Sequence, residues 1–433
     1  MPAAGLVKRR AAGFCVALGL ALCVVQGHAE NATPWSTAWA AAMLPSPVPA
    51  SAVRATAQIA PLLHGQTLRQ MVTLSAGGRR IRIRLSNAFG TQPLRIDAAS
   101  VGERAAGGRP GRLDAATLHA LRFDGRPAVV LPPGTARYSD PLELPVHGGD
   151  TLGISLYVAG EATPTTWHPD ARRDNFISPR GDYTAAATMP VASTTGAALW
   201  LSGVDVQADE PLPVLVALGD SITNGFQSTP GANRSYPQAL ARRLRGLHPA
   251  CRVAVANAGI DGNEISDRDG GYGPGDSMQR RFARDVAGQS GARFVLLLGG
   301  INDIGETTMA LRPHGRTLDG KTIAANVIAA QRQIIAQAHT AGLRIIGATL
   351  PPFEGTWSAY SAAGEQARRQ VNDWIRQHAG FDGVADFDAA LRDPAHPARL
   401  RPDLDSGDHI HPNDHGYAVM AKAVPTSLLG CGQ

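Results

Sequence analysis

Hydrophobic and polar residues alternate in short runs over the first half of the chain. Arg80–Leu85 and Leu152–Val158 alternate with a period of two, which is typical of antiparallel strands with one buried face. Glycine and proline turns separate these runs, and long helical periodicity is missing. We therefore expect an all-β sandwich or jelly-roll domain over residues 30–209, with further strands at Arg69–Leu74, Leu94–Val101, Ala128–Leu131 and Ala198–Val204.

The pattern changes near Leu212, where apolar runs begin to alternate with helical periods. Val214–Leu218 is apolar throughout, as expected for a strand that is buried on both faces. Five such βα units predict a parallel five-stranded sheet with helices on both faces, a three-layer α/β/α domain over residues 210–433. The other strands are expected at Val253–Asn257, Phe294–Leu298, Leu343–Leu350 and Val384–Phe387, and the helices at Tyr236–Leu247, Ser277–Ala287, Lys321–Ala341, Gly364–His378 and His415–Leu429.

The first 29 residues differ from both halves. Three basic residues at positions 8–10 precede an uncharged apolar run from Ala11 to Val25, and the small residues Gly27 and Ala29 follow. This order is typical of a secretory signal peptide. As an uncleaved membrane anchor, the run of 15 residues would be too short to span a bilayer comfortably. We expect cleavage after about Ala29 and a secreted or periplasmic protein.

Cleavage would change the cysteine count and the charge. Of four cysteines, Cys251 and Cys431 would remain, and two cysteines in an oxidising compartment favour a disulfide; two unpaired thiols are the alternative. The net charge would fall from +5 to +2, because three basic and no acidic residues are lost. The chain has no basic stripe that would indicate nucleic acid, and no later apolar run is long enough for a stable membrane anchor.

Four segments place reactive or hydrogen-bonding groups after a predicted strand or before the last helix. Parallel α/β sheets bind ligands beyond the carboxyl ends of their strands. Ser221, in Gly219-Asp220-Ser221, could act as a nucleophile if a base removes its proton. His411 could be that base, with Asp408 accepting from its other ring nitrogen. The backbone N–H groups of Ser221 and Gly259 and the side-chain amide of Asn302 could stabilise an oxyanion.

These blocks resemble those of the GDSL/SGNH hydrolases. The family is recognised by Gly-Asp-Ser, a lone glycine, Gly-x-Asn-Asp and Asp-x-x-His, which here are Gly219–Ser221, Gly259, Gly300–Asp303 and Asp408–His411. The resemblance implies a flavodoxin-like α/β/α fold and esterase or acylhydrolase activity without a metal or other cofactor. It assigns Ser221, Asp408 and His411 to a catalytic triad and Ser221, Gly259 and Asn302 to the oxyanion hole. The N-terminal half, with Trp35-Ser-Thr-Ala-Trp-Ala, resembles the extra domain of a bacterial subgroup that includes xylan-associated arylesterases.

Several of these residues also have an alternative interpretation: Asp408 could cap a loop, and Asn302 could merely stabilise a turn. Gly275-Asp276-Ser277 repeats the first triplet, but it follows a glycine-rich loop, so Ser277 is expected to cap a helix. His409 could replace His411 as the base. His409, His411 and nearby carboxylates such as Asp405 could instead suggest a metal site, although a triad uses the same residues more economically. Trp167-His168-Pro169 in the first half could contact a ligand or could be an ordinary buried segment.

The sequence thus predicts a secreted serine esterase that forms an acyl-enzyme. A carbohydrate O-acetylesterase is the first choice of activity, because an appended β domain suggests polymer targeting. A lipase or arylesterase is the alternative within the same class. A glycan-binding protein with a degenerate hydrolase half is the alternative from another class. The expected partners are a small ester or an acylated polysaccharide.

Overall fold

The computed structural model describes residues 34–46, 60–107, 109–247, 249–267, 274–316, 318–356, 358–377 and 380–431. The predicted signal peptide lies outside these ranges. Residues 33–433 fall into one compact unit, and one large hydrophobic core extends from Ala38 to Cys431. The domain boundary between residues 209 and 210 therefore stays a prediction. Within the ranges given, no helix combines the length and the apolar character needed to cross a membrane.

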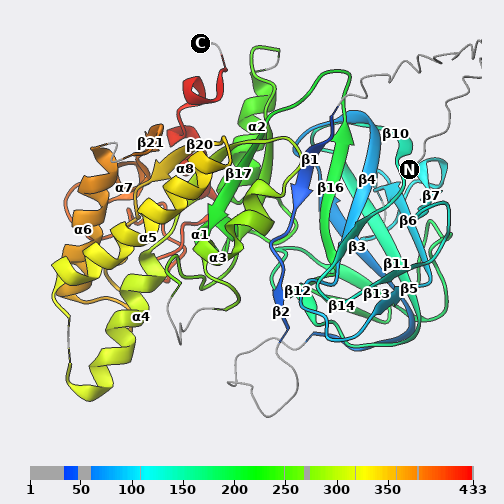
Figure 1. The fold of residues 1–433 in the computed structure, drawn as a ribbon, viewed down its shortest axis with the longest axis horizontal. Coiled ribbons are helices and arrows are strands. Elements are labelled where there is room, and N and C mark those ends of the chain that lie inside the picture. Colours follow the sequence, from blue (N-terminus) through cyan, green and yellow to red (C-terminus); the bar gives the residue numbers. More distant parts are fainter. Residues whose placement is uncertain are drawn as a thin grey trace, which may run out of the picture. The chain divides into compact units, whose positions relative to one another are not determined.

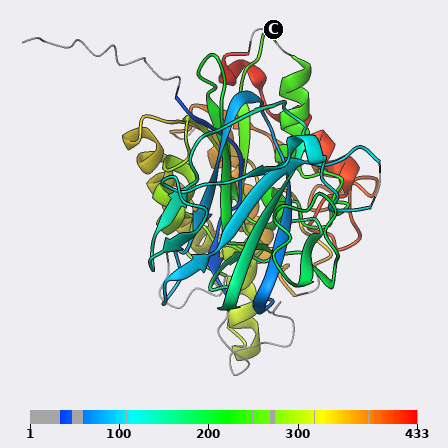
Figure 2. The ribbon, with the colours of Figure 1, turned by 90° about the vertical axis from the view of Figure 1, so that its right-hand side faces the viewer.

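The N-terminal half is built from two main antiparallel sheets, drawn largely in blue and cyan (Figures 1 and 2). The first has the order β1 (Ser36–Ala40), β16 (Leu201–Gln207), β4 (Gly78–Ser86) and β10 (Leu142–Val146), with β9 (Ala136–Tyr138) also paired to β4. The second has the order β14 (Ser193–Thr195), β13 (Asn175–Arg180), β3 (Leu63–Thr73), β11 (Thr151–Ala162), β6 (Ala98–Glu103) and β7 (His119–Ala120). The smaller sheets are β15 (Ala198–Leu199), β12 (Thr166–His168) and β2 (Leu44–Pro45), and β5 (Leu94–Ile96) with β8 (Val129–Leu131).

The alternating runs of the sequence form the centres of these sheets. In β4, Ile81, Ile83 and Leu85 are fully buried while the arginines between them are only partly buried, which confirms a strand with one core face. β11 differs from the expected half-buried strand, because its Ser155 is also fully buried. The guanidinium of Arg69 on β3 covers that face and donates to Ser155 Oγ over 2.9 Å. The predicted all-β sandwich is thus confirmed, with a second buried face that alternation alone did not indicate.

The C-terminal half contains the predicted five-stranded parallel sheet. Its order is β18 (Ala254–Gly259), β17 (Val214–Gly219), β19 (Ala292–Leu298), β20 (Arg344–Ala348) and β21 (Gly383–Ala385). The order reverses between β17 and its two neighbours, as in flavodoxin-like sheets, so the carboxyl end of β17 is a topological switch point. The helices pack as two groups, α2 (Tyr236–Gly246) against α8 (Asp414–Ala423), and α5 (Gly320–Thr340) against α6 (Ala362–Arg376) (Figure 1).

Several predicted elements are shorter or interrupted. The strand expected at Ala198–Val204 breaks at Trp200, which has a φ of 59°. The helix expected at Ser277–Ala287 is α3 (Met278–Phe282) followed by a π-helical turn at Ala283–Ala287. The last helix stops at Ala423 because Pro425 follows, and a short 3₁₀ turn at Thr426–Leu429 takes its place. Helix α4 (Ile301–Leu311), which begins beside Asn302, was not predicted.

Hydrogen bonds join β strands of the first half to the parallel sheet. Ser75, which follows β3, donates its hydroxyl to Ala38 O and accepts the N–H of Val255 in β18, at 2.8 and 3.0 Å. Near the end of the chain, Cys251 and Cys431 form a disulfide that closes a separation of 180 residues. This bond ties the C-terminal segment to the residues just before β18, within the second half of the chain.

Candidate active site

Ser221 lies where the central strand β17 ends. Strand β17 ends at Gly219, and the short helix α1 (Ser221–Asn224) starts at Ser221 itself. Between them, the Asp220 side chain caps α1 by accepting the N–H of Ile222 over 3.0 Å. A side chain at position 219 would collide with Thr223, so the tight turn needs glycine. The turn therefore holds the Ser221 hydroxyl at the carboxyl end of the sheet, where α/β proteins bind ligands.

The structure brings Ser221, His411 and Asp408 into one hydrogen-bonded row. Ser221 Oγ lies 2.7 Å from His411 Nε2, and His411 Nδ1 lies 2.7 Å from Asp408 Oδ2. The other Asp408 oxygen accepts the backbone N–H groups of Ile410 and His411, at 3.1 and 2.9 Å. Burial alone would raise the pKa of Asp408, but the hydrogen bond and charge of His411, with these N–H groups, hold the pKa well below its usual range. Asp408 is therefore an ionised partner for the imidazole.

The His411 ring is held from its other side by the segment that follows α1. The ring centroids of Phe226 and His411 are 4.8 Å apart, and the Phe226 N–H donates to Ser221 O over 2.9 Å. Gln227 has a φ of 65° and donates to Asp408 Oδ2 over 3.4 Å. The orientation of the imidazole thus depends on side chains that no sequence block indicated.

His409, the alternative base, pairs with Asp405, whereas His411 is the histidine that contacts Ser221. Its Nδ1 lies 2.7 Å from Asp405 Oδ2, and its side chain is 52% exposed. The other Asp405 oxygen accepts the N–H groups of Gly407 and His409. These contacts close the loop before α8. His409 and Asp405 therefore have a structural role in this loop.

Asn302 lies in the first turn of α4, beside the loop that follows β18. Its side-chain nitrogen donates one hydrogen bond to Asn263 O, at 3.0 Å, and carries a second N–H for another acceptor. The Ser221 N–H, at the start of α1, makes no hydrogen bond to the described residues. The Ser221 N–H lies in the first turn of α1, where backbone N–H groups have no intrahelical partner, and the first turn of α4 positions the Asn302 side chain.

Gly259 does not fit the role that the resemblance implied. Its N–H already donates to Asn257 Oδ1 over 2.9 Å, so it is not free to meet a ligand oxygen. A side chain at this position would collide with the backbone of Thr223 and Asn224. The glycine is needed for close packing of β18 against α1. The assignment of Gly259 to the oxyanion hole is therefore corrected to a packing role.

A second glycine three residues later has the properties that Gly259 lacks. Ile260–Asn263 is a turn closed by the Asn263 N–H on Ile260 O, at 3.1 Å, and Gly262 within it has a φ of 71°. In the part of the chain that is described, the Gly262 N–H has no acceptor. The Ile260 N–H donates to Gly219 O over 3.1 Å, which fixes this turn beside the Ser221 turn.

Arg281, which the sequence did not single out, locks these loops together. The side chain is fully buried and donates to Asn263 Oδ1, Ala258 O and Gly219 O over 3.0, 2.8 and 2.9 Å. It also lies 3.3 Å from Asp285. A buried arginine needs several acceptors and an ionised partner. This residue therefore joins the ends of β17 and β18 to the Gly262 turn.

Asp220 is a fully buried carboxyl group with one oxygen that has no hydrogen-bond partner among the described residues. Burial raises the pKa of Asp220 to about 7, although the Ile222 N–H and the charge of His411 act to lower it. Because folding raises this pKa, the ionised form is destabilised in the folded state. The free energy of unfolding should therefore fall as the pH rises from about 4 through about 7, where the buried group ionises.

We predict that Asp220→Asn removes this pH-dependent cost. The amide oxygen can still accept from the Ile222 N–H, so the cap should remain. The Tm of the variant minus the Tm of the unchanged protein should be larger at pH 8 than at pH 5, by roughly 2 °C or more. Thermal unfolding followed by circular dichroism across this range measures the difference. A Tm difference that does not change with pH would show that Asp220 does not ionise within the fold.

The N-terminal half contributes side chains close to this site. His168, which closes β12, has its Nε2 3.1 Å from Asn224 Oδ1, and the Asn224 amide donates to Asp170 O over 2.9 Å. The Arg172 guanidinium pairs with Asp170 over 2.9 Å and lies 5.7 Å from the centroid of the Phe226 ring. The segment around His168 thus contacts both α1 and the aromatic ring that supports His411.

Ser277, in the second Gly-Asp-Ser triplet, caps a helix as expected. Its hydroxyl oxygen accepts the Arg280 N–H over 3.2 Å at the start of α3. The preceding residue Asp276 pairs with Arg284 over 2.7 Å. The two triplets therefore differ in their place in the fold, one at the end of a buried parallel strand and the other at an ordinary helix start.

Residues 217–419 match the model of the GDSL-like lipase/acylhydrolase family. No curated protein matches the chain. Among solved structures, the chain is similar to a GDSL-like lipase from Bacteroides thetaiotaomicron (17% identity, TM-score 0.34, 50% of this chain and 87% of that chain). It is also similar to a carbohydrate acetylesterase family member from Sinorhizobium meliloti (15% identity, TM-score 0.38, 51% of this chain and 100% of that chain). A third similar structure is an acetylxylan esterase from Geobacillus stearothermophilus (20% identity, TM-score 0.36, 50% of this chain and 94% of that chain).

These structural likenesses are remote, so the assignment rests on the matched segment. That segment begins within β17, ends within α8 and includes Ser221, Asn302, Asp408 and His411. Residues 217–419 belong to the GDSL-like lipase/acylhydrolase family, and the protein is an ester-hydrolysing serine hydrolase.

Proposed function

We propose that this enzyme hydrolyses carboxylic esters through an acyl-enzyme on Ser221, with His411 as the general base and Asp408 as its orienting partner. The observation that supports these roles most directly is the row of two 2.7 Å contacts from Ser221 Oγ to His411 and from His411 to Asp408. Such a row activates a hydroxyl that would otherwise be a weak nucleophile.

In the first step, Ser221 Oγ attacks the acyl carbon while its proton passes to His411 Nε2. The ionised Asp408 stabilises the imidazolium that forms. His411 then gives the proton to the leaving alcohol, and the acyl group stays on Ser221. In the second step, His411 removes a proton from water, which attacks the acyl carbon. His411 then returns this proton to Ser221 Oγ as the bond between Oγ and the acyl carbon breaks and the acid is released.

The oxyanion of each tetrahedral intermediate needs donors that are already in place. We assign this role to the Ser221 N–H, the second N–H of the Asn302 amide and the Gly262 N–H. Gly262 replaces Gly259, because the Gly259 N–H is occupied by Asn257. These donors come from α1, from α4 and from the turn held by Arg281.

The replacement Asn302→Ala should lower kcat on p-nitrophenyl acetate by roughly 100- to 1000-fold, because one oxyanion donor is lost. The KM should change little, since the donor acts chiefly on the intermediate. Steady-state kinetics separates the two constants. A loss confined to KM would mean that Asn302 binds the ground-state ester instead.

We propose a carbohydrate O-acetylesterase as the activity. The surroundings of the triad are polar, with His168, Asp170 and Arg172 contributed by the N-terminal half and Gln227 beside Asp408. Such groups suit an alcohol rich in hydroxyls better than a lipid chain. The N-terminal half would then hold part of the sugar polymer near Ser221.

A series of p-nitrophenyl esters from acetate to octanoate, together with an acetylated xylo-oligosaccharide, tests this activity. We expect the highest kcat/KM on acetate and release of acetate from the oligosaccharide. A maximum on octanoate would instead indicate a lipase, and turnover of aromatic esters alone would indicate an arylesterase. If the protein binds glycans but hydrolyses no ester, it would be a glycan-binding protein with a degenerate hydrolase half. The Ser221→Ala protein is the control for background hydrolysis.

We also propose that the protein is exported, with its leader removed after about Ala29. The Cys251–Cys431 disulfide suits an oxidising compartment. N-terminal sequencing of the protein recovered from periplasmic and culture fractions tests the proposal. A mature protein that still begins at residue 1 would contradict it.

A further inference from the structure

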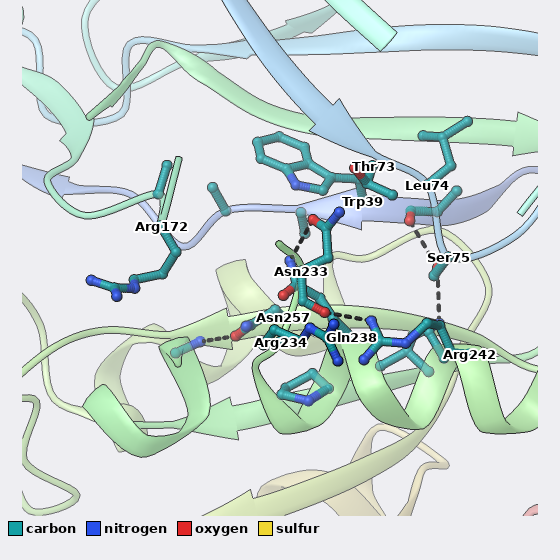
Figure 3. A pocket seen from close by; sticks show the side chains of 18 of the residues that line it. Trp39, Thr73, Leu74, Ser75, Arg172, Asn233, Arg234, Gln238, Arg242 and Asn257 are labelled. Atoms are coloured by element: carbon teal, nitrogen blue, oxygen red, sulfur yellow. Dashed lines mark hydrogen bonds between the residues drawn. The ribbon is translucent and has the colours of Figure 1, made fainter. Parts of the chain in front are cut away.

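A cavity of about 310 Å³ lies between β1, the end of β3 and helix α2. This volume is at the lower end of the range for small-molecule sites, roughly 300–1,000 Å³. Figure 3 shows Trp39 of β1 on one side and Asn233, Gln238 and Arg242, from α2 and the loop before it, on the other. The ester chemistry proposed above uses none of these four residues.

The cavity is lined by arginines and by no acidic residue. Arg172, Arg234, Arg242 and Arg245 belong to its wall, whereas no aspartate or glutamate of the described chain does. The guanidinium of Arg172 is engaged by Asp170. For Arg234 and Arg245, no hydrogen bond or ion pair to the described residues is present. Arg242 donates to the neutral backbone oxygen of Asn233, and no carboxylate in the wall balances its charge. The charges of Arg234, Arg242 and Arg245 therefore remain available to an anion.

Helix α2 presents two of these cations on one face. Gln238, Arg242 and Arg245 follow one another at helical spacing, so their side chains share a face. Burial and the charges of Arg234 and Arg245 lower the pKa of Arg242, while the charge of Asp414 acts to raise it. Burial also lowers the pKa of Arg245, and the charge of Asp150 acts to raise it. Neither aspartate lines the cavity, so bringing an anion into it would relieve repulsion between like charges.

The rest of the wall suits a sugar ring more than a bare ion. The side-chain nitrogens of Asn233 and Gln238 each keep an N–H that no described residue accepts, and these can donate to sugar hydroxyl groups. Asn257 and Thr73 line the cavity but are already paired with other groups. The partly buried Trp39 offers an aromatic surface to the apolar side of a ring. Inorganic phosphate would use the arginines but would leave these groups and most of the volume unused.

The cavity also reaches the catalytic end of the parallel sheet. Asn224, three residues after Ser221, and Gly259, at the end of β18, both line it. His168, which contacts Asn224, lines it as well. A group bound here would therefore lie on the side of Ser221 where the N-terminal half approaches α1.

We propose that this cavity binds a carboxylate-bearing sugar, a uronic acid, so that the substrate of the enzyme is an acidic, acetylated glycan. This inference rests on the proposed carbohydrate esterase activity for its biological meaning, but the binding itself does not depend on hydrolysis. Arginine suits the carboxylate because its planar guanidinium can donate two parallel hydrogen bonds.

Calorimetric titration of the Ser221→Ala protein tests the site without turnover. The probes are xylotriose, the same trisaccharide carrying one glucuronic acid, and sodium phosphate. We expect the glucuronate-bearing probe to bind about tenfold or more tightly than xylotriose and phosphate. In Arg242→Gln/Arg245→Gln its affinity should fall by about tenfold or more. The single change Arg234→Gln, in the exposed loop before α2, should also lower the affinity for the glucuronate-bearing probe.

The matched control is Arg79→Gln/Arg137→Gln, which removes two exposed arginines of the N-terminal half with side chains 75% and 53% exposed. It has the same net charge as the test variant and should bind the glucuronate probe normally. Thermal unfolding checks that all variants fold. Equal affinity for the neutral and acidic sugars, phosphate binding as tight as the acidic sugar, or an equal loss in the control would each overturn the proposal. Wild-type turnover of p-nitrophenyl acetate tests the esterase separately, so failure of one proposal is not failure of the other.

Discussion

Replacement of Ser221 by alanine is expected to lower kcat on p-nitrophenyl acetate by roughly 10⁴- to 10⁶-fold. The hydroxyl is the group proposed to form the acyl bond, and its Oγ lies 2.7 Å from His411 Nε2. The remaining rate should reflect the oxyanion donors and binding alone. Stability should change little, because the Ser221 side chain caps no helix; Asp220 does so instead. Kinetics with purified protein, freed of contaminating esterases, measures the loss.

The chain offers its own control in Ser277, the serine of the second Gly-Asp-Ser triplet. Ser277→Ala removes the helix cap on the Arg280 N–H and should cost about 1 kcal/mol of stability. Its kcat should stay within about threefold of the unchanged protein. If Ser221→Ala kept most of the activity, or if Ser277→Ala abolished it, the proposed nucleophile would be wrong.

His411→Ala is expected to lower kcat by a similar factor, roughly 10⁴- to 10⁶-fold. Without the imidazole, nothing takes the proton of Ser221 or protonates the leaving alcohol. Because the two residues act as one unit, the double variant Ser221→Ala/His411→Ala should be no slower than either single variant. Additive losses in the double variant would contradict a shared step.

His409→Ala is the matched control for the second prediction. His409 lies two positions away, also pairs with an aspartate, and is half exposed. Its loss should cost about 1 kcal/mol of stability or less and leave kcat within about threefold. A large loss of activity in this variant with full activity in His411→Ala would reverse the assignment of the base.

The strands and the triad could be predicted because their signals are local. A continuous apolar run such as Val214–Leu218 must be buried on both faces, and a parallel sheet then places everything after its strands at one edge. The spacing between Asp408 and His411 is short enough for one loop to join them, as it does. The structure brings Ser221, Asp408 and His411 into one hydrogen-bonded row, while their catalytic roles and that of Asn302 stay predictions.

The glycine that we propose for the oxyanion hole could not be chosen from the sequence, because two glycines stand three residues apart at and after the end of β18. The choice depends on where each N–H points. An asparagine two residues before Gly259 takes up its N–H, while the turn around Gly262 leaves the N–H without an acceptor in the described chain. Contacts of this kind depend on backbone direction, which residue type does not encode.

Long-range supports were also beyond the sequence. Arg281 follows the glycine-rich loop and reads as an ordinary helical arginine, yet it is fully buried against three acceptors from two strands and a turn. Arg172 contacts Phe226 across a sequence separation that no local pattern spans. Both positions are specified by tertiary packing, so only the folded chain reveals their part in placing the site.

Labelling of the whole protein with a fluorophosphonate, followed by peptide mapping, tests the central claim most directly. The reagent forms a covalent bond only with a serine whose hydroxyl is activated, so it reports on both the identity of the nucleophile and its environment. We expect one modified serine, Ser221, and no label after His411→Ala. A label on Ser277, or no label on the active enzyme, would contradict the account.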